Sequence, residues 1–433
     1  MKTFFDEIRR GASPNLDECV EALGDRLPLL RRFRETPQDP EWHAEGDVHI
    51  HTQMVMDEAY QLLAGPAAHL EGEGRLLLVL GALLHDIAKP ICTRPQELKG
   101  VERIVARGHE AAGRSYLAPR LLEELPYPSL EVLLGLVGHH HEPKFLVVKE
   151  RSAGAYQRVS RLADPELLYW VEQADMRGRT CRDRAEAIEK IDLYRLFAED
   201  YGAFVRHGEQ DPSWRARLVE SLAGHGDQVI DFALSEARRS LERGEIHSLE
   251  EAVARSFQAR EARSDLVITV GPSGSGKTTF AQKHLAGFDH LSLDDLREEL
   301  GSDRGDQGAN DRVLAEGRER LKASLRKQRP VVWDATSLRQ DFRTRVAGLG
   351  FDYGTLVTLV VFHLDLADYH RRNRARTDAV PPNVLDNQLE RMEWPELDEA
   401  HRVLFLDGNQ RVRAAFGVHG ALPYGLAWAP ARP

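Results

Sequence analysis

The stretch LVITVGPSGSGKTTF, residues 266–280, constrains the fold more than any other part of the sequence. An apolar run rich in β-branched residues predicts a buried strand, and it leads directly into a segment that fits G-x-x-x-x-G-K-[ST] without a mismatch. Its glycines allow successive backbone N–H groups to point at phosphate oxygens, at the N-terminus of a helix whose dipole favours anions. Residues 271–278 therefore predict a nucleoside triphosphate site.

Each position of this loop has an expected role. Lys277 is expected to reach the β and γ phosphates of ATP, and the hydroxyl of Thr278 is expected to contact Mg²⁺. The alternative is a glycine-rich turn that merely ends a strand, but strand, loop, Lys-Thr pair and helix all occur in order. The other positions expected to bind the nucleotide are Gly271, Ser273, Gly274, Ser275, Gly276 and Thr279.

Length and composition bound the rest of the molecule. A chain of 433 residues exceeds one ordinary core, so two or three domains are expected. With 42% hydrophobic and 29% charged residues, no apolar run of membrane length and a charged N-terminus, we expect a cytoplasmic protein without a membrane partner. Three widely separated cysteines predict neither a disulfide framework nor a thiolate zinc site.

The charge is acidic overall and locally basic. A net charge of −11 argues against a protein that coats long nucleic acids by general electrostatics, although it leaves room for one that grips a strand end. Against this background the basic run at residues 370–376 is conspicuous.

The N-terminal third contains histidines and carboxylates at intervals typical of metal ligands. The apolar segment LLLVLGALLHDIAKP ends in His85 and Asp86, which are costly to bury unless something pairs with them. Imidazole and carboxylate ligands without thiolates suit two ions of the Mn, Fe, Ni, Co or Zn class, which would clamp a phosphate. Lys89 lies four residues after His85 and three after Asp86, so it is expected on the same helix face, within reach of a phosphate oxygen. A single histidine on an apolar helix face is more often a hydrogen-bonded core residue than a metal ligand.

The order H…HD…H…HH…D resembles the HD phosphohydrolase superfamily, and the segments WHAEGDVHIHT and HDIAKP resemble HD domains attached to tRNA nucleotidyltransferases. The resemblance covers about residues 40 to 180 and implies that Arg179, four residues after the last aspartate, contacts phosphate. His43 and His49 are expected to stay in the loop, outside the metal site. The metal ligands implied are His51, His85, Asp86, His109 and Asp175, joined by His139, His140 or both, a choice that the run of three histidines leaves open.

The C-terminal third alternates strands and helices, which predicts a parallel sheet. Carboxylates follow two of the expected strands: Asp294 and Asp295 in HLSLDDLREEL, and Asp334 in PVVWDATSL. Such positions at the carboxyl ends of strands are where α/β folds place their chemistry. The simpler alternatives are a helix cap for the aspartate pair and a solvated helix face for the arginines.

Strand-DD-x-x-R, strand-D-x-T and R-x-x-x-R followed by A-V-P together resemble the 5′-hydroxyl polynucleotide kinase domain of phage-type end-healing enzymes, over about residues 264 to 400. One residue is missing between the last arginine and Ala379 relative to that family. The resemblance implies Asp294 as general base on the 5′-OH, Arg297 on the acceptor's 3′-phosphate and Asp334 at or near the acceptor site. It implies Arg372 and Arg376 as lid arginines on the transferred phosphate.

The order of these parts resembles the bacterial HD-Pnk family of bifunctional end-healing enzymes. The expected organisation is a two-domain chain: an all-α HD domain at 1–180, a helical connection at 181–263 and an α/β P-loop kinase domain with a parallel sheet at 264–433. The resemblance implies a kinase acting with ATP and Mg²⁺ on 5′-OH ends of RNA or DNA, and a metal phosphoesterase acting on 2′,3′-cyclic or terminal phosphates. A separate ligase is a further expected partner.

Two alternatives remain open from the sequence. One is a small-molecule or nucleotide kinase fused to an HD nucleotide phosphohydrolase, against which D-D-x-x-R argues. The other is a kinase with a non-catalytic HD regulatory module, which the near-complete ligand set disfavours.

Overall fold

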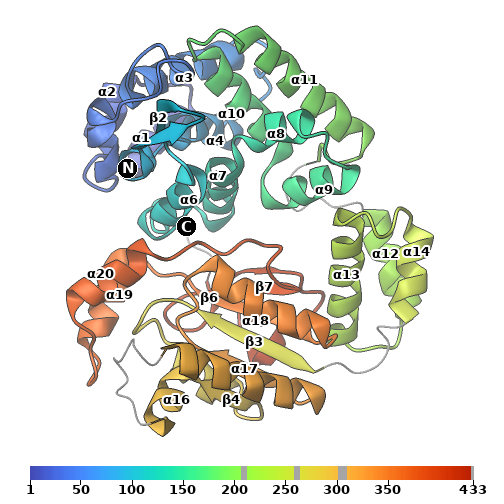
Figure 1. The fold of residues 1–433 in the computed structure, drawn as a ribbon. Coiled ribbons are helices and arrows are strands. Elements are labelled where there is room, and N and C mark those ends of the chain that lie inside the picture. The colour runs from blue at the N-terminus through green and yellow to red at the C-terminus, as the bar shows by residue number, and fades with distance from the viewer. Residues whose placement is uncertain (206–211, 258–263, 301–309, 431–433) are drawn as a thin grey trace. The chain divides into compact units, whose positions relative to one another are not determined.

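The chain divides into two compact units, Met1–Gln210 and Asp211–Pro433. The structure, a computed structural model, describes residues 1–205, 212–257, 264–300 and 310–430. Figure 1 shows both units and labels their helices and strands where there is room.

The first unit is built mainly from helices (Figure 1). Its elements are α1 (Lys2–Arg9), α2 (Leu16–Leu23), the 3₁₀ helix η1 (Pro28–Glu35), α3 (Val48–Leu63), α4 (Glu73–Leu84), α5 (Lys89–Cys92), β1 (Arg94–Leu98), β2 (Val101–Val105), α6 (His109–Leu121), α7 (Tyr127–His139), α8 (Glu142–Val148), α9 (Ala153–Leu162), α10 (Pro165–Arg177) and α11 (Arg184–Asp200).

Two of these helices, α4 and α10, are central because they are buried on nearly all sides. Every residue of α4 from Leu76 to Leu84 is buried, and α10 is buried from Leu167 to Met176. A helix that is apolar all round belongs in the middle of a bundle, and α4 packs between α3, α7 and α10.

Local capping sets where the site-bearing helices begin. The side chain of Asp47 accepts a hydrogen bond from the N–H of Ile50 and starts α3 just before His51. Asp164 caps α10 in the same way, with Pro165 at the first helical position.

The first unit also contains a β-hairpin, in which β1 pairs antiparallel with β2. The prediction of an all-α domain is thus correct for the helical body but omits this hairpin. The sequences of β1 (RPQEL) and β2 (VERIV) contain few apolar residues. They therefore lack the regular alternation of apolar and polar residues that identifies a half-buried strand.

The second unit is an α/β domain with a mostly parallel sheet, as the sequence predicts (Figure 1). The strand order is β4-β5-β3-β6-β7-β8; β8 alone runs antiparallel to its neighbour in this sheet. The strands are β3 (Asp265–Val270), β4 (Asp289–Ser292), β5 (Val331–Asp334), β6 (Leu356–Phe362), β7 (Arg402–Leu406) and β8 (Val412–Phe416).

Helices cover both faces of this sheet. Phe280 of α15 packs in one core with Val267 and Val360, whereas Gly350 of α18 lies against Leu266 and Val357. Since successive residues of a strand point to opposite faces, α15 and α18 are on opposite sides. The helices of this part are α15 (Lys277–His284), α16 (Leu293–Glu299), α17 (Asn310–Arg326), α18 (Gln340–Asp352), α19 (Leu366–Arg374) and α20 (Pro382–Glu390), followed by the short 3₁₀ helix η3 (Pro423–Gly425).

The segment 181–263, predicted to be a helical connection, is divided between the two units. Helix α11 packs on α8 and α10 of the first unit. Helices α12 (Pro212–Ser221), α13 (Asp227–Glu242) and α14 (Leu249–Ser256) belong to the second. Side chains of α12 and α13 form a core with Leu356 of β6, and Asp231 of α13 lies 2.6 Å from the guanidinium of Arg402 on β7, both buried.

Candidate functional site

In the first unit, four of the predicted metal ligands meet from three helical regions. The Nε2 atom of His51 lies 3.1 Å from a carboxylate oxygen of Asp175 and 3.7 Å from one of Asp86. The Nε2 atom of His85 lies 3.2 Å from Asp86. These four side chains are almost completely buried, so the sequence places two carboxylates and two imidazoles in the interior of the bundle.

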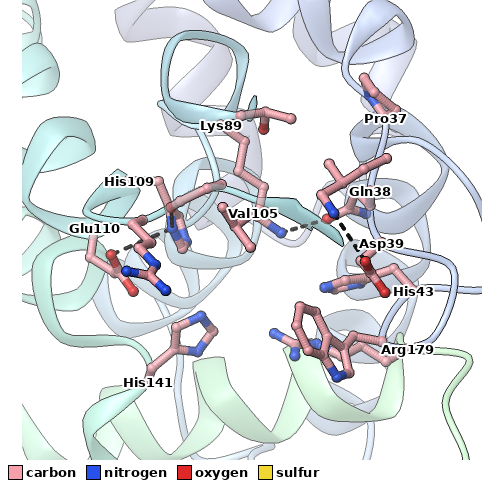
Figure 2. A pocket seen from close by; sticks show the side chains of 15 residues that line it. Pro37, Gln38, Asp39, His43, Lys89, Val105, His109, Glu110, His141 and Arg179 are labelled. Carbon is pink, nitrogen blue, oxygen red and sulfur yellow. Dashed lines mark hydrogen bonds and ion pairs between the residues drawn. The ribbon is translucent and has the colours of Figure 1, made fainter. Parts of the chain in front are cut away.

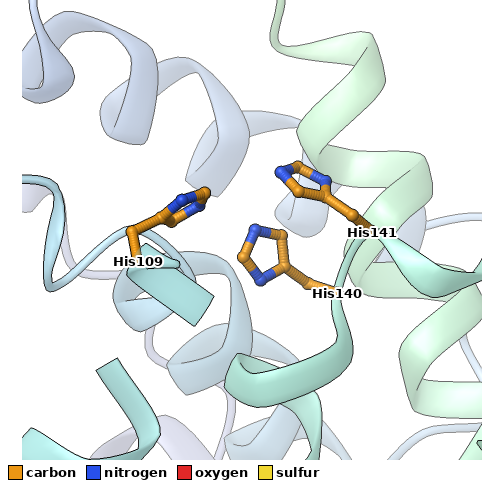
Figure 3. A group of neighbouring side chains, drawn as sticks. All are labelled: His109, His140 and His141. Carbon is orange, nitrogen blue, oxygen red and sulfur yellow. The ribbon is translucent and has the colours of Figure 1, made fainter. Parts of the chain in front are cut away.

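Three further histidines continue this cluster. The Nε2 atom of His109 lies 3.1 Å from the second carboxylate oxygen of Asp86. The imidazoles of His109, His140 and His141 are turned toward one another (Figure 3), with ring centres 4.1 to 5.6 Å apart. The cluster is therefore continuous from His51 to His141.

Backbone carbonyls fix the orientation of three of these imidazoles. The Nδ1 atoms of His85, His109 and His140 lie 2.7 to 2.9 Å from the carbonyl oxygens of Ala82, Ala106 and Val137, each three residues earlier. Because a carbonyl only accepts, each Nδ1 carries the hydrogen, and each Nε2 presents its lone pair to the cluster. This is the arrangement in which histidines bind metal ions.

The side chains fit divalent metal ions. The Nε2 atom of His140 is buried without a hydrogen-bond partner, which is costly unless an ion accepts its lone pair. Three groups among the described residues each bring their ligand atoms within 4.8 Å of one another: His51-His85-Asp86, His109-His140-His141 and His43-Glu45-His51.

The electrostatics at His140 and at Asp86 favour the protonation states that ligands require. Burial lowers the pKa of His140 well below its usual range, helped by the neighbouring imidazoles, so the ring stays neutral. Burial acts to raise the pKa of Asp86, but the neighbouring His85 and Lys89 outweigh it and hold that pKa well below the usual range. Neutral imidazoles and ionised carboxylates bind cations without releasing protons.

The sequence left open whether His139, His140 or both of them join the metal cluster. The structure brings His140 and His141 to the cluster, and the groups found among the described residues do not include His139. His139 is the last residue of α7, and successive residues of a helix point about 100° apart. The chain then leaves the helix, so that the next two side chains face the same centre.

His43, expected to stay outside the site, lies against His51 with ring centres 4.7 Å apart. Glu45 joins the two imidazoles, at 2.9 Å from His43 and 3.0 Å from His51. His49 is outside, near Asp17, as expected. Sequence reasoning missed Glu45 because it lies in a loop, where no periodicity reports which way a side chain points.

A pocket of about 250 Å³ opens beside the cluster (Figure 2). Lys89 and Arg179, the predicted phosphate contacts, both line it. The ammonium of Lys89 lies 2.6 Å from Asp86, and Arg179 holds Asp175 through two hydrogen bonds of 2.5 and 3.0 Å. Each predicted cation thus contacts one of the carboxylates of the metal cluster and also faces the open pocket.

In the second unit, the P-loop follows β3 as predicted. Gly274 and Gly276 adopt φ angles of +78° and +111°, which favour glycine, and a Cβ atom at Gly274 would lie 3.3 Å from the backbone of Asn373. Lys277, Thr278 and Thr279 form the first turn of α15, the latter two exposed. The loop backbone therefore has the conformation that phosphate binding requires.

The ammonium of Lys277 donates to the carbonyls of Gly271 and Pro272, both at 2.9 Å. Burial lowers the pKa of Lys277 to about 8, although the charges of Asp334 and Asp294 oppose that shift. Both predicted carboxylates therefore act on the P-loop lysine.

Asp334 ends β5, next to β3, and receives hydrogen bonds from several sides. His290 lies 3.0 Å from one carboxylate oxygen. Burial acts to raise the pKa of Asp334, but His290, Lys277 and the hydroxyl of Thr278 together hold it below its usual range. A carboxylate beside the P-loop threonine is where P-loop enzymes hold Mg²⁺.

Asp294 is exposed in the first turn of α16, two residues after β4 ends, rather than on the strand end itself. Arg297 lies three residues further along this helix, 2.5 Å from Asp294. The helix spacing that the D-D-x-x-R motif implies is thus present.

Arg372 and Arg376, the predicted lid arginines, lie close to the P-loop, at the end of α19 and just after it. A Cβ atom at Gly276 would lie 3.6 Å from the guanidinium of Arg372, and one at Gly274 would lie 3.4 Å from Arg376. The Nε atom of Arg372 is buried without a hydrogen-bond partner. Sequence reasoning missed Gln388 of α20, which accepts a 2.7 Å hydrogen bond from the N–H of Ser273 in the P-loop. Only the folding of α19 and α20 back onto the loop reveals this contact.

Comparisons with known proteins agree with this division. Residues 48–166 match the family model described as "HD domain", and residues 266–395 match one described as "AAA domain". No helix among the described ranges 1–205, 212–257, 264–300 and 310–430 is long and apolar enough to cross a membrane.

Curated relatives carry the name "Multifunctional CCA protein". The one from Hahella chejuensis is 30% identical over 223 residues, 46% of this chain and 48% of the relative. The one from Paraburkholderia phymatum is 28% identical over 230 residues, 50% of each chain. The chain spans about half the length of these two relatives. It therefore combines an N-terminal HD domain with a C-terminal P-loop domain of the kinase type.

Proposed function

We propose that this protein heals broken ends of RNA or DNA, phosphorylating 5′-OH ends in the second unit and removing 2′,3′-cyclic or terminal phosphates in the first. The main support for the proposed kinase activity is the set of charged groups around Lys277. Asp294 and Asp334 act on the charge of Lys277, with Arg376 among the nearby cations.

In the kinase reaction, Lys277, Arg372 and Arg376 neutralise the charge of the phosphate in transfer. Asp294 accepts the proton of the attacking 5′-hydroxyl, and Arg297 binds the 3′-phosphate of the same acceptor nucleotide. Thr278 and Asp334 would hold Mg²⁺, which would offset the negative charge of the ATP phosphates.

In the phosphoesterase reaction, His51, His85, Asp86, Asp175, His109 and His140 would hold two divalent ions of the Mn, Fe, Ni, Co or Zn class, with His141 beside them. Such ions lower the pKa of water to about 7 and so supply a nucleophile near neutral pH. Lys89 and Arg179 neutralise the phosphate oxygens that face the pocket. The described lining of the pocket contains neither serine nor cysteine to serve as nucleophile.

The deciding experiment supplies ATP and an RNA that carries 5′-OH and 2′,3′-cyclic phosphate ends. We expect a 5′-phosphate to appear and the cyclic phosphate to disappear, the latter only with divalent metal. Free nucleosides offered in parallel test the alternative of a small-molecule kinase. Phosphorylation of nucleosides but not of the RNA 5′ end would contradict the proposal. A separate ligase is expected to join the healed ends.

A further inference from the structure

The pocket beside the metal cluster has an aromatic side chain on its rim. Trp42 lines this pocket and keeps 41% of its surface exposed. A large exposed aromatic residue next to a phosphate-binding site has a hydrophobic face that water solvates poorly. The same pocket is lined by the cations Lys89, Arg107 and Arg179.

Several contacts hold the loop that carries Trp42. Asp39 accepts hydrogen bonds from the N–H of Glu41 and the N–H of Ile104, at 3.1 and 3.0 Å, and so ties the loop to β2. On the other side, the N–H of Ala44 donates to the carbonyl of Thr180 at 3.0 Å, just beyond Arg179. The loop is thereby fixed to both walls of the pocket.

Arg103 supports the indole directly. Its guanidinium lies over the ring of Trp42, 5.5 Å from the ring centre, and forms ion pairs with Asp39 and Glu41. A cation over one face of an indole orients the ring, and the remaining exposure leaves indole surface available.

We infer that Trp42 is a stacking platform for the base of the nucleotide whose phosphate enters the metal cluster. This inference rests on the proposed phosphoesterase function and names its substrate as a polynucleotide end that carries a base. Stacking tolerates every base because each has a π face, so the site reads the presence of a base but not its identity.

The test compares wild type, Trp42→Ala and Trp42→Phe on oligonucleotides with a 3′-phosphate. One oligonucleotide ends in a normal nucleotide, and the other ends in a stable abasic residue. With the normal end, Trp42→Ala is expected to raise KM roughly ten- to a hundredfold and Trp42→Phe only a few-fold. With the abasic end, all three proteins are expected to share the same high KM. Trp428→Ala removes a tryptophan of the second unit that is 58% exposed and serves as the control.

Equal losses on normal and abasic ends would overturn the platform and make Trp42 merely structural. Fluorescence anisotropy of the same labelled oligonucleotides, 5′-phosphorylated, measures binding without turnover. If wild type binds the normal end more tightly than the abasic end, and Trp42→Ala loses this difference, the result supports the stacking platform. Absence of phosphate release in the same experiment would overturn only the proposed phosphoesterase function. Identical binding by wild type and Trp42→Ala overturns the platform.

Discussion

At the scale of single residues, backbone carbonyls decide what the histidines can do. His85, His109 and His140 each give their Nδ1 hydrogen to a carbonyl three residues earlier. The tautomer is therefore fixed by the course of the chain before any ion binds. This arrangement lowers the reorganisation that metal binding requires.

Asp294→Ala is expected to slow 5′ phosphorylation by about 10² to 10⁴-fold, because the attacking hydroxyl loses its proton acceptor. Transfer of labelled phosphate from ATP to a 5′-OH oligonucleotide measures the effect. The matched control is Asp295→Ala, which removes the adjacent exposed carboxylate and should retain activity within a few-fold. Similar rates for Asp294→Ala and wild type would assign the base elsewhere.

Glu172 on α10 makes the stability of the first unit depend on pH. Burial raises the pKa of its carboxyl to about 8, from an ordinary 4.5, against the influence of Lys144. Between these values the folded state holds a proton that the unfolded state has released, so the free energy of unfolding falls as pH rises from about 5 to 8.

Glu172→Gln is expected to remove the part of the fall in unfolding free energy that the Glu172 carboxyl causes, since an amide does not titrate. Thermal unfolding at pH 6 and pH 8 gives the measurement: the wild type should lose more Tm than the variant over this interval. Parallel losses in the two proteins would show that Glu172 is ionised throughout.

The sequence predicts the identity of most site residues but not their orientation. The P-loop and His85-Asp86 are identified by local spacing; Lys277 begins α15, and the Nε2 atom of His85 lies 3.2 Å from Asp86. His141, Glu45 and Gln388 are not, because each reaches its site through a loop or a helix end whose direction is set by tertiary packing. Sequence spacing and periodicity report only on residues that are close along the chain, so they do not predict contacts that tertiary packing creates.

At the scale of elements, helix α18 shows how closely the second unit is packed. A Cβ atom at Gly350 would lie 2.5 Å from Val357 on β6 and 2.9 Å from Leu266 on β3. A Cβ atom at Gly348, two residues earlier in the same helix, would meet nothing within 4 Å. Gly348 is therefore a matched control for a substitution at Gly350 in the same helix.

Gly350→Ala is expected to destabilise the second unit by about 1–3 kcal/mol, because the β-branched Val357 cannot move aside. Gly348→Ala should instead be neutral or stabilise it by up to about 1 kcal/mol through helix propensity. Urea unfolding of the two variants decides between these outcomes. Equal effects at both positions would mean that α18 can shift away from the sheet at little cost.

Element existence is predicted better than element boundaries. The buried strands β3, β5, β6 and β7 are recognisable from their apolar runs, whereas β1, β2 and β8 are not. Strand β8, VRAAF, has a sequence that suits several conformations and becomes a strand by pairing with β7.

At the scale of the whole molecule, the two candidate sites lie in separate units. His85→Ala is therefore expected to abolish the metal-dependent phosphoesterase and spare the kinase, while Lys277→Ala does the reverse. Assays of both activities on one protein preparation measure this, and metal analysis of the His85 variant should show reduced content. Loss of both activities in either variant would indicate one composite site or global unfolding.

The phosphoesterase is expected to act by direct attack of water, without a covalent intermediate. Single-turnover reaction in ¹⁸O-labelled water should therefore place the label in the phosphate product. Lys89→Ala and Arg179→Ala should retain metal yet react slowly, since they remove charge that faces the phosphate. Label found first on a protein side chain would contradict this mechanism.

The buried pair of Asp231 and Arg402 has a practical consequence for anyone who separates the two units. A fragment cut just before β3 would keep the whole nucleotide loop but lose α13. Arg402 would then lose its 2.6 Å partner and retain Asp265 at 4.0 Å, and the apolar side of Leu356 would face water. The smallest portable form of the P-loop domain must therefore start upstream of α12, and gene fusions or chimeras that cut at the motif boundary should yield insoluble protein.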